Sequence, residues 1–259
     1  MPNSPEWPPQ PYPEGAARNS GQENRERGEV APISEEFLEK FYTSTVFLAQ
    51  LKEASKKVRQ FGGREFGFGI WKRLSSEETL FTDIIGSAYE DAAAIQEAHD
   101  ELESRLKQDG RDRDFIILGN LHFHSDMGRD PIIVPSGSDG DLGQSYFDRY
   151  RNQLKVGFDV PTIEMIATHL VSGELKLLAY QEPLFYKPME QRAIKREIDE
   201  TILSLIGSGE TTQEDVINAL QHYGYKLNVI RTSKGEFLQE ELNKLRAFAF
   251  IPRVWQAEK

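Results

Sequence analysis

The stretch that most constrains the fold is "DFIILGNLHFHS", residues 114–125, a strongly apolar run that predicts a central strand. Helical patterns lie on either side of it. A second helix is expected over 89–108, with Ile95, Leu102 and Leu106 on one side. Before it, apolar residues at spacings of three and four predict an amphipathic helix ending at Gly62-Gly63: Phe47, Leu51, Ala54, Val58 and Phe61.

The remaining patterns predict a sheet flanked by helices. Residues 64–74, "REFGFGIWKRL", alternate at period two, with Phe66, Phe68 and Ile70 on one face, and "ETLFTDIIGS" is expected as the antiparallel neighbour. After a Pro/Gly/Ser loop we expect a helix near 142–154. Two further strands follow, "TIEMIATHLV" and "ELKLLAYQE", joined by a turn at Ser172-Gly173. This order predicts an α/β fold.

Composition divides the chain into three parts. Residues 1–32 are rich in Pro, Gly, Asn and Glu and predict a flexible tail. Residues 33–182 hold the pattern above, and 183–259 predict a mostly helical addition with one strand. This addition is expected to pack on the first domain or to be semi-independent. We expect it to bind a partner or orient a substrate.

Composition also excludes several classes of protein. The 259 residues include no cysteine, so disulfides, thiolate zinc sites and thiol nucleophiles are excluded. The 31 Lys and Arg against 42 Asp and Glu give a net charge of −11, which makes nucleic acid an unexpected partner. The chain shows neither a signal-peptide pattern nor a bilayer-spanning apolar run. We therefore expect a cytoplasmic protein that does not bind membranes.

The histidines of the central strand point to a metal. Period two sends His122 and His124 to the same side of the strand, where they can supply two zinc ligands. A catalytic zinc site needs a third protein ligand, and the following loop offers Ser136, Ser138, Asp139 and Asp141. It also needs a base near the water. Glu65 fits, because Gly67 and Gly69 leave its strand face otherwise bare.

Taken together, Glu65 in "GREFGFGIW", "HFH" and "VPSGSDGDL" resemble the motif of the JAMM (JAB1/MPN-domain) zinc metalloproteases. That family has a glutamate on an early strand, His-x-His at the end of a later apolar strand, and Ser-x-x-Asp in the loop leading into a helix. The resemblance covers a little over half the chain. It implies a sandwich of a mixed sheet and flanking helices, related to cytidine deaminases, over 33–182.

Two departures from the family's pattern stand out. Eleven residues separate His124 from Ser136, which is longer than usual, and Ser125 stands where the family commonly has proline. The loop also holds two overlapping Ser-x-x-Asp matches. Pro135-Ser136 reproduces the family's Pro-Ser, which favours Ser136 with Asp139, and Ser138 with Asp141 is the alternative register.

The resemblance implies amide hydrolysis with Zn²⁺. Glu65 would take a proton from the water and deliver it to the departing amine, and Ser136 would donate a hydrogen bond to the oxyanion. The deaminase reaction is excluded because it needs cysteine ligands. In this family the substrate would be the carboxy terminus or conjugate of a ubiquitin-like protein, and the alternative is a non-catalytic MPN scaffold. Among the other histidines, His99 is expected to be solvated in the acidic stretch "QEAHDELE".

Overall fold

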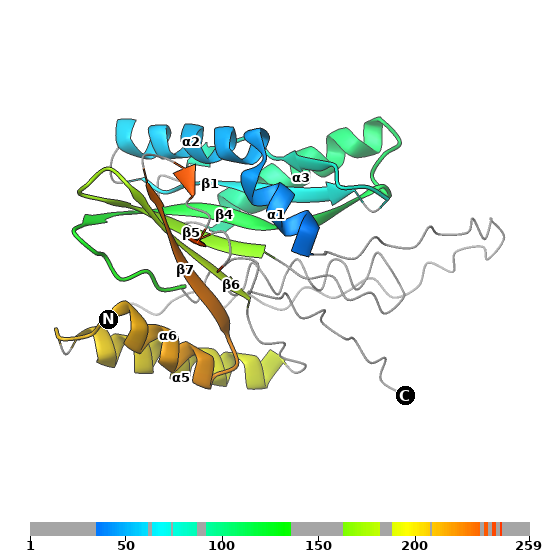
Figure 1. Ribbon diagram of the computed structural model, residues 1–259. Coiled ribbons are helices and arrows are strands. Elements are labelled where there is room, and N and C mark those ends of the chain that lie inside the picture. The colour runs from blue at the N-terminus through cyan, green and yellow to red at the C-terminus, as the bar shows by residue number, and fades with distance from the viewer. Residues whose placement is uncertain are drawn as a thin grey trace.

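A computed structural model shows one mixed sheet between two layers of helices (Figure 1). The α/β class expected from the sequence is confirmed. The structure describes residues 35–61, 64–73, 75–86, 92–135, 163–181, 188–207, 209–233, 236–237, 240–241 and 244. The expected tail over 1–32 and the expected helix near 142–154 lie outside these residues.

The strands follow one another across the sheet almost in chain order, as β2-β1-β4-β5-β6-β7-β8, with β3 also paired to β1. Neighbouring strands are antiparallel except for β4 and β5, which are parallel. The expected hairpin is present, and Gly173 in its turn has φ +89°. The strands span β1 Phe66–Arg73, β2 Thr79–Phe81, β3 Ile85–Gly86, β4 Phe115–Gly128, β5 Ile163–Leu170, β6 Leu175–Gln181, β7 Lys226–Ser233 and β8 Glu236–Phe237.

One face of the sheet is covered by α1 (Glu35–Thr43) and α2 (Thr45–Gln60). Ser44 lies between these two helices and begins α2. Its side chain caps α2 by accepting a hydrogen bond from the backbone N–H of Phe47. The apolar spacing predicted for α2 is confirmed by its buried residues, although Phe61, just beyond the helix, is exposed. These helices pack on every second residue of β1, namely Phe66, Phe68 and Ile70.

The opposite face is covered by two groups of helices. Helix α3 (Ala92–Gln108) lies over β1 and β4, with Leu102 and Leu106 packed on Trp71 and Phe115. Helices α5 (Pro188–Gly207) and α6 (Gln213–His222) lie over the other half of the sheet, at the bottom of Figure 1. Their apolar cluster joins residues of three strands and both helices, including Ile166, Leu178, Leu227, Ile202 and Val216.

The segment 183–259 therefore contributes to the same sheet and core as 33–182. Strand β7 pairs with β6 over six residues, from Lys176↔Arg231 to Gln181↔Lys226. The boundary that composition suggests near residue 182 falls between two strands that are neighbours in one sheet.

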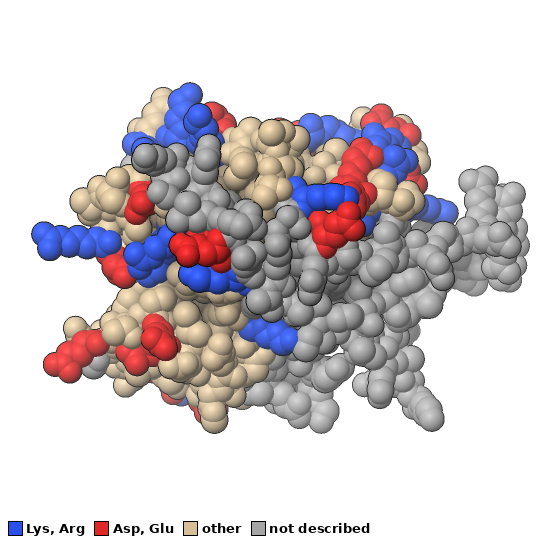
Figure 2. All heavy atoms as spheres, viewed as in Figure 1, with Lys and Arg blue, Asp and Glu red and all other residues tan. Residues whose placement is uncertain are grey.

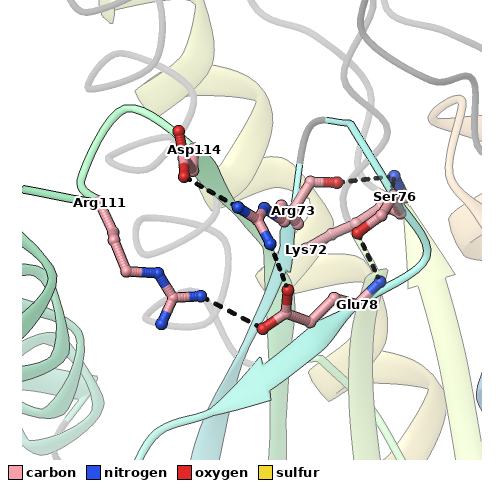
Figure 3. A network of polar contacts seen from close by, with 6 residues as sticks. All are labelled: Lys72, Arg73, Ser76, Glu78, Arg111 and Asp114. Atoms are coloured by element: carbon pink, nitrogen blue, oxygen red, sulfur yellow. Dashed lines mark hydrogen bonds and ion pairs between the residues drawn. The ribbon is translucent and has the colours of Figure 1, made fainter.

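A polar network holds the turn between β1 and β2 at the edge of the sheet (Figure 3). The Arg73 guanidinium contacts Glu78 at 3.0 Å and Asp114 at 3.2 Å, which ties the turn to the start of β4. The buried Lys72 ammonium donates a hydrogen bond to the carbonyl of Ser76 at 2.9 Å. Burial lowers the pKa of Lys72 below its ordinary value.

Basic and acidic side chains are interspersed over the described surface in the view of Figure 2. Lys40, for example, contacts both Glu36 and Glu77 at the surface. Exposed pairs of this kind contribute little to stability. No helix among the described residues has both the length and the apolar composition needed to cross a membrane.

Candidate metal centre

The two histidines of the HxH motif lie on β4 with their imidazole rings side by side. The ring centroids of His122 and His124 are 5.2 Å apart at an interplanar angle of 42°. Residues i and i+2 of a strand have Cα atoms about 6.6 Å apart. The rings are closer than the backbone positions that carry them, so the two side chains converge on one face of the sheet.

This arrangement fits a shared tetrahedral metal ion. Two imidazoles bound to one zinc, with Zn–N bonds of about 2.0–2.1 Å, have ring centres roughly 5 Å apart. His122 is 9% exposed and His124 is half-buried, so His124 is the more exposed of the two side chains.

Glu65 immediately precedes β1, the strand that pairs with β4. The antiparallel register of β1 and β4 pairs Gly67 with His122 and Phe66 with Phe123. Continuing that register by one residue places Glu65 opposite His124. Residues opposite each other in an antiparallel pair point to the same face, with Cβ atoms about 4.5–5.5 Å apart. The half-buried Glu65 is therefore expected on the same face of the sheet as the two histidines, although it is not on their strand.

The glycines beside Glu65 make room for α3, so that face of β1 is not bare. A Cβ placed on Gly67 would lie 2.8 Å from Cδ1 of Ile95 and 3.0 Å from Cβ of His122. On the other side, the β5 neighbour of His122 is Ile166, which belongs to the apolar cluster under α5 and α6. The histidine pair thus lies on the sheet between α3 and the helices of the 183–259 segment.

The third ligand predicted from the sequence cannot be placed in this geometry. The described residues reach Pro135, and both Ser-x-x-Asp matches begin after it: Ser136 with Asp139, and Ser138 with Asp141. Within the described ranges, no three His, Asp or Glu side chains gather as a metal-binding group. Among the predicted site residues, the structure places the His122 and His124 rings side by side, with Glu65 just before β1, the strand that pairs with β4. The choice between Ser136 with Asp139 and Ser138 with Asp141 remains a prediction.

His99 is buried, and the expectation that it is solvated was wrong. Its ring is 0% exposed and lies over Gly69, where any Cβ would collide with the imidazole. Trp71 Nε1 donates a hydrogen bond to His99 Nδ1 at 2.8 Å, and His99 Nε2 lies 2.7 Å from Asn120 Oδ1. Asn120 Nδ2 in turn donates to Glu164 Oε2 at 3.1 Å. Four elements meet in this buried polar chain.

The donor groups fix the direction of these hydrogen bonds from Trp71 to Glu164. An indole N–H can only donate, so Nδ1 of His99 accepts and Nε2 carries the proton toward Asn120. The Asn120 amide then points its donor at Glu164, which is 4% exposed. Asn120 also precedes His122 by two residues on the same strand face. These hydrogen bonds therefore hold α3 and β5 against the part of β4 that carries the histidine pair.

The sequence pattern did not predict the hydrogen bonds of His99, and the reason is physical. Two acidic residues next to His99, Asp100 and Glu101, lie on the solvent face of α3, whereas the ring of His99 turns to the sheet. Two sequence features could have indicated that His99 is buried. Gly69 leaves space for a ring, and Asn120 is a polar residue inside an apolar strand.

Two other histidines have separate environments. His169 on β5 is buried on the opposite face of the sheet, where its Nε2 lies 2.9 Å from Ser55 Oγ and its ring stacks on Phe123. Within the described part of the chain, its Nδ1 has no hydrogen-bond partner. His222 is exposed on α6. Neither residue contributes to the candidate centre.

Comparisons with known proteins do not place the chain in a family. No family model matches it, and no curated protein matches it.

Proposed function

We propose that the protein is a zinc-dependent metallopeptidase whose metal is held by His122, His124 and a carboxylate of the following loop. The observation that carries this proposal is the convergence of the two imidazoles, 5.2 Å apart, on one strand face with Glu65 one register step away. Asp139 is the favoured third ligand, and Asp141 is the alternative. The mixed sheet with helices on both faces is consistent with an MPN-type sandwich.

The residues assigned to the proposed centre suit hydrolysis of an amide. When bound, zinc would polarise the substrate carbonyl and lower the pKa of a water molecule toward neutrality. The Glu65 carboxylate would accept a proton from the attacking water and deliver it to the leaving nitrogen. The Ser136 hydroxyl would donate a hydrogen bond to the developing oxyanion. A substrate consistent with the motif is the carboxy terminus, or the lysine linkage, of a ubiquitin-like protein.

Metal content tests the ligand assignment. The purified protein is expected to bind about one zinc per chain, because the sequence supplies a single three-ligand set. Replacing both His122 and His124 by Ala should abolish tight zinc binding while the circular dichroism spectrum stays that of a folded protein. His222→Ala is the matched control, since this histidine is exposed on α6. Stoichiometric zinc in the double variant would exclude the site.

The register is tested by Asp139→Ala and Asp141→Ala. Loss of zinc only in Asp139→Ala supports the Ser136 register, and loss only in Asp141→Ala moves the site to Ser138 and Asp141. If neither variant loses zinc, the third ligand lies elsewhere.

Glu65→Gln separates the enzyme from a non-catalytic scaffold. Glutamine keeps the size of the side chain but cannot accept the proton, so zinc content should stay unchanged. Hydrolysis of a panel of ubiquitin-like fusions should fall about 10²- to 10⁴-fold. Loss of zinc would make Glu65 a ligand. A wild-type protein that binds zinc but cleaves no fusion would favour the scaffold.

A further inference from the structure

The segment that leaves β4 and leads to the candidate third ligand is anchored at two points by side chains from β6, α6 and β7. This segment, residues 129–135, is called the approach segment. It begins after Gly128, whose carbonyl accepts a hydrogen bond from the backbone N–H of Val171 at 2.9 Å. In Figure 1 it bends back from the end of β4 toward the side of the sheet covered by α5 and α6.

The first anchor is Asp130. Its two carboxylate oxygens each accept a hydrogen bond at 2.8 Å, one from Nζ of Lys176 on β6 and one from the guanidinium of Arg231 on β7. Lys176 is 1% exposed and also donates to the carbonyl of Pro131 at 2.7 Å. Chiefly through the hydrogen bond from Lys176, these cations lower the pKa of the Asp130 carboxyl.

The second anchor is Gln213, the first residue of α6. Its side-chain amide makes two hydrogen bonds to Ile133: Oε1 accepts from the backbone N–H and Nε2 donates to the backbone carbonyl, both at 2.8 Å. The amide thus pairs with both backbone groups of one residue, as a neighbouring strand would. The Ile133 side chain is 1% exposed and packs in the cluster that contains Ile166, the β5 neighbour of His122.

The start of α6 is itself held in place. Thr212 caps the helix, with its hydroxyl accepting from the backbone N–H of Asp215 at 3.2 Å. The Asp215 carboxylate accepts from the backbone N–H of Thr212 at 2.8 Å, which completes a capping box. Gln213 therefore presents its amide from a fixed position.

We propose that Gln213 and Asp130 are positioning residues for the metal centre. They fix the path of residues 129–135, the described part of the connection that leads from His124 toward the candidate acidic ligand. This inference rests on the proposed function. It assigns part of the construction of the centre to α6 and β7, in the segment that the sequence pattern sets apart from the catalytic domain.

Zinc affinity of full-length variants tests the inference, measured by competition with a chromophoric chelator. Gln213→Ala removes both hydrogen bonds to Ile133 and should weaken zinc binding about 10- to 100-fold, the range typical of residues that orient ligands. Gln213→Glu can still accept from the Ile133 N–H but cannot donate to its carbonyl, so an intermediate loss is expected. Glu214→Ala changes the exposed neighbouring position and should leave zinc affinity unchanged.

Asp130→Asn provides an independent variant at the other anchor. The side chain keeps its shape and is 56% exposed, so the fold should tolerate the change while the contact with two cations weakens. Its zinc affinity should also fall about tenfold or more. Thermal unfolding of the metal-free proteins is measured in parallel, because a role confined to stability would lower the midpoint and leave zinc affinity intact.

The outcomes separate the two proposals. If the wild-type protein binds no zinc, the proposed function fails and this inference fails with it. If the wild type binds zinc and both Gln213→Ala and Asp130→Asn bind it equally well, the ligand assignment stands and the positioning role is overturned. Weakened binding in both variants, with Glu214→Ala unaffected, supports the positioning role.

Discussion

At the residue scale, the cost of burying His99 and His169 must be offset by specific neighbours. His99 has both ring nitrogens in hydrogen bonds, to Trp71 and Asn120. His169 has a described partner, Ser55, at one nitrogen only. Burial, with a smaller effect of Arg59, lowers the pKa of His169 to about 4. The folded state therefore resists protonation of this ring.

His169 should make the protein less stable in mild acid. The unfolded ring takes up a proton near pH 6.5 and the folded one near pH 4, so stability is lost as the pH falls through that interval. The full loss is about 3 kcal/mol. Urea unfolding between pH 7 and pH 4.5 should show a shallower pH dependence in His169→Gln than in the wild type.

His222→Gln controls for the removal of a histidine, because that residue is exposed. Equal pH dependence in His169→Gln and the wild type would mean that other groups dominate acid unfolding.

At the scale of elements, the contact between α3 and β1 depends on glycine. Gly69 lets the His99 ring lie directly on the strand, and Gly67 does the same for Ile95. The helix can then approach β1 closely enough for His99 to reach Asn120 on the next strand. Gly67 and Gly69, which carry no side chain, thus form the surface of β1 on which α3 packs.

Gly69→Ala should disrupt this docking. The new methyl group would collide with the His99 ring, and relief requires moving the ring and its two hydrogen bonds. Overpacking of this kind typically costs about 1–3 kcal/mol. Gly207→Ala, at the end of α5, is the matched control, since nothing lies within 4 Å of the added carbon there. Guanidinium unfolding of both variants should show a loss only at position 69; equal stability would argue against close docking.

Local patterns predicted most of these elements but not all of their partners. Period two placed Asn120, His122 and His124 on one face, and helical spacing predicted the buried side of α2, because each signal lies within one element. The burial of His99 depends on residues of two strands, β1 and β4, that lie more than 20 residues away in sequence, so its acidic surroundings were misleading. Similarly, alternation marks β7 as a strand, but nothing local states that it pairs with β6.

At the scale of the whole molecule, the sheet and its second helical layer are completed only by the last third of the chain. Strand β7 covers the edge of β6, and α5 and α6 cover Ile166, Leu178 and Tyr180. An uncovered edge beside an apolar face favours aggregation. The 183–259 segment is thus required for a closed core.

Deletion of residues 183–259 is therefore expected to yield an insoluble or non-cooperatively unfolding product, even in the presence of zinc. Soluble yield and thermal unfolding measure this. Deletion of residues 1–32, which composition predicts to be a flexible tail, is the comparison and should leave the unfolding midpoint nearly unchanged. A soluble 1–182 fragment with a sharp unfolding transition would show that the first part folds alone.

The order of strands across the sheet also bears on biosynthesis. From β4 to β7 the sheet grows by one neighbour at a time in the direction of translation. A nascent chain can add each strand as it emerges from the ribosome. The partners of Asp130 and Ile133, however, include Arg231 and Gln213, which are made some 80 to 100 residues later. The approach segment can take its final path only after α6 and β7 have been synthesised, so the proposed peptidase would remain inactive until these elements have emerged.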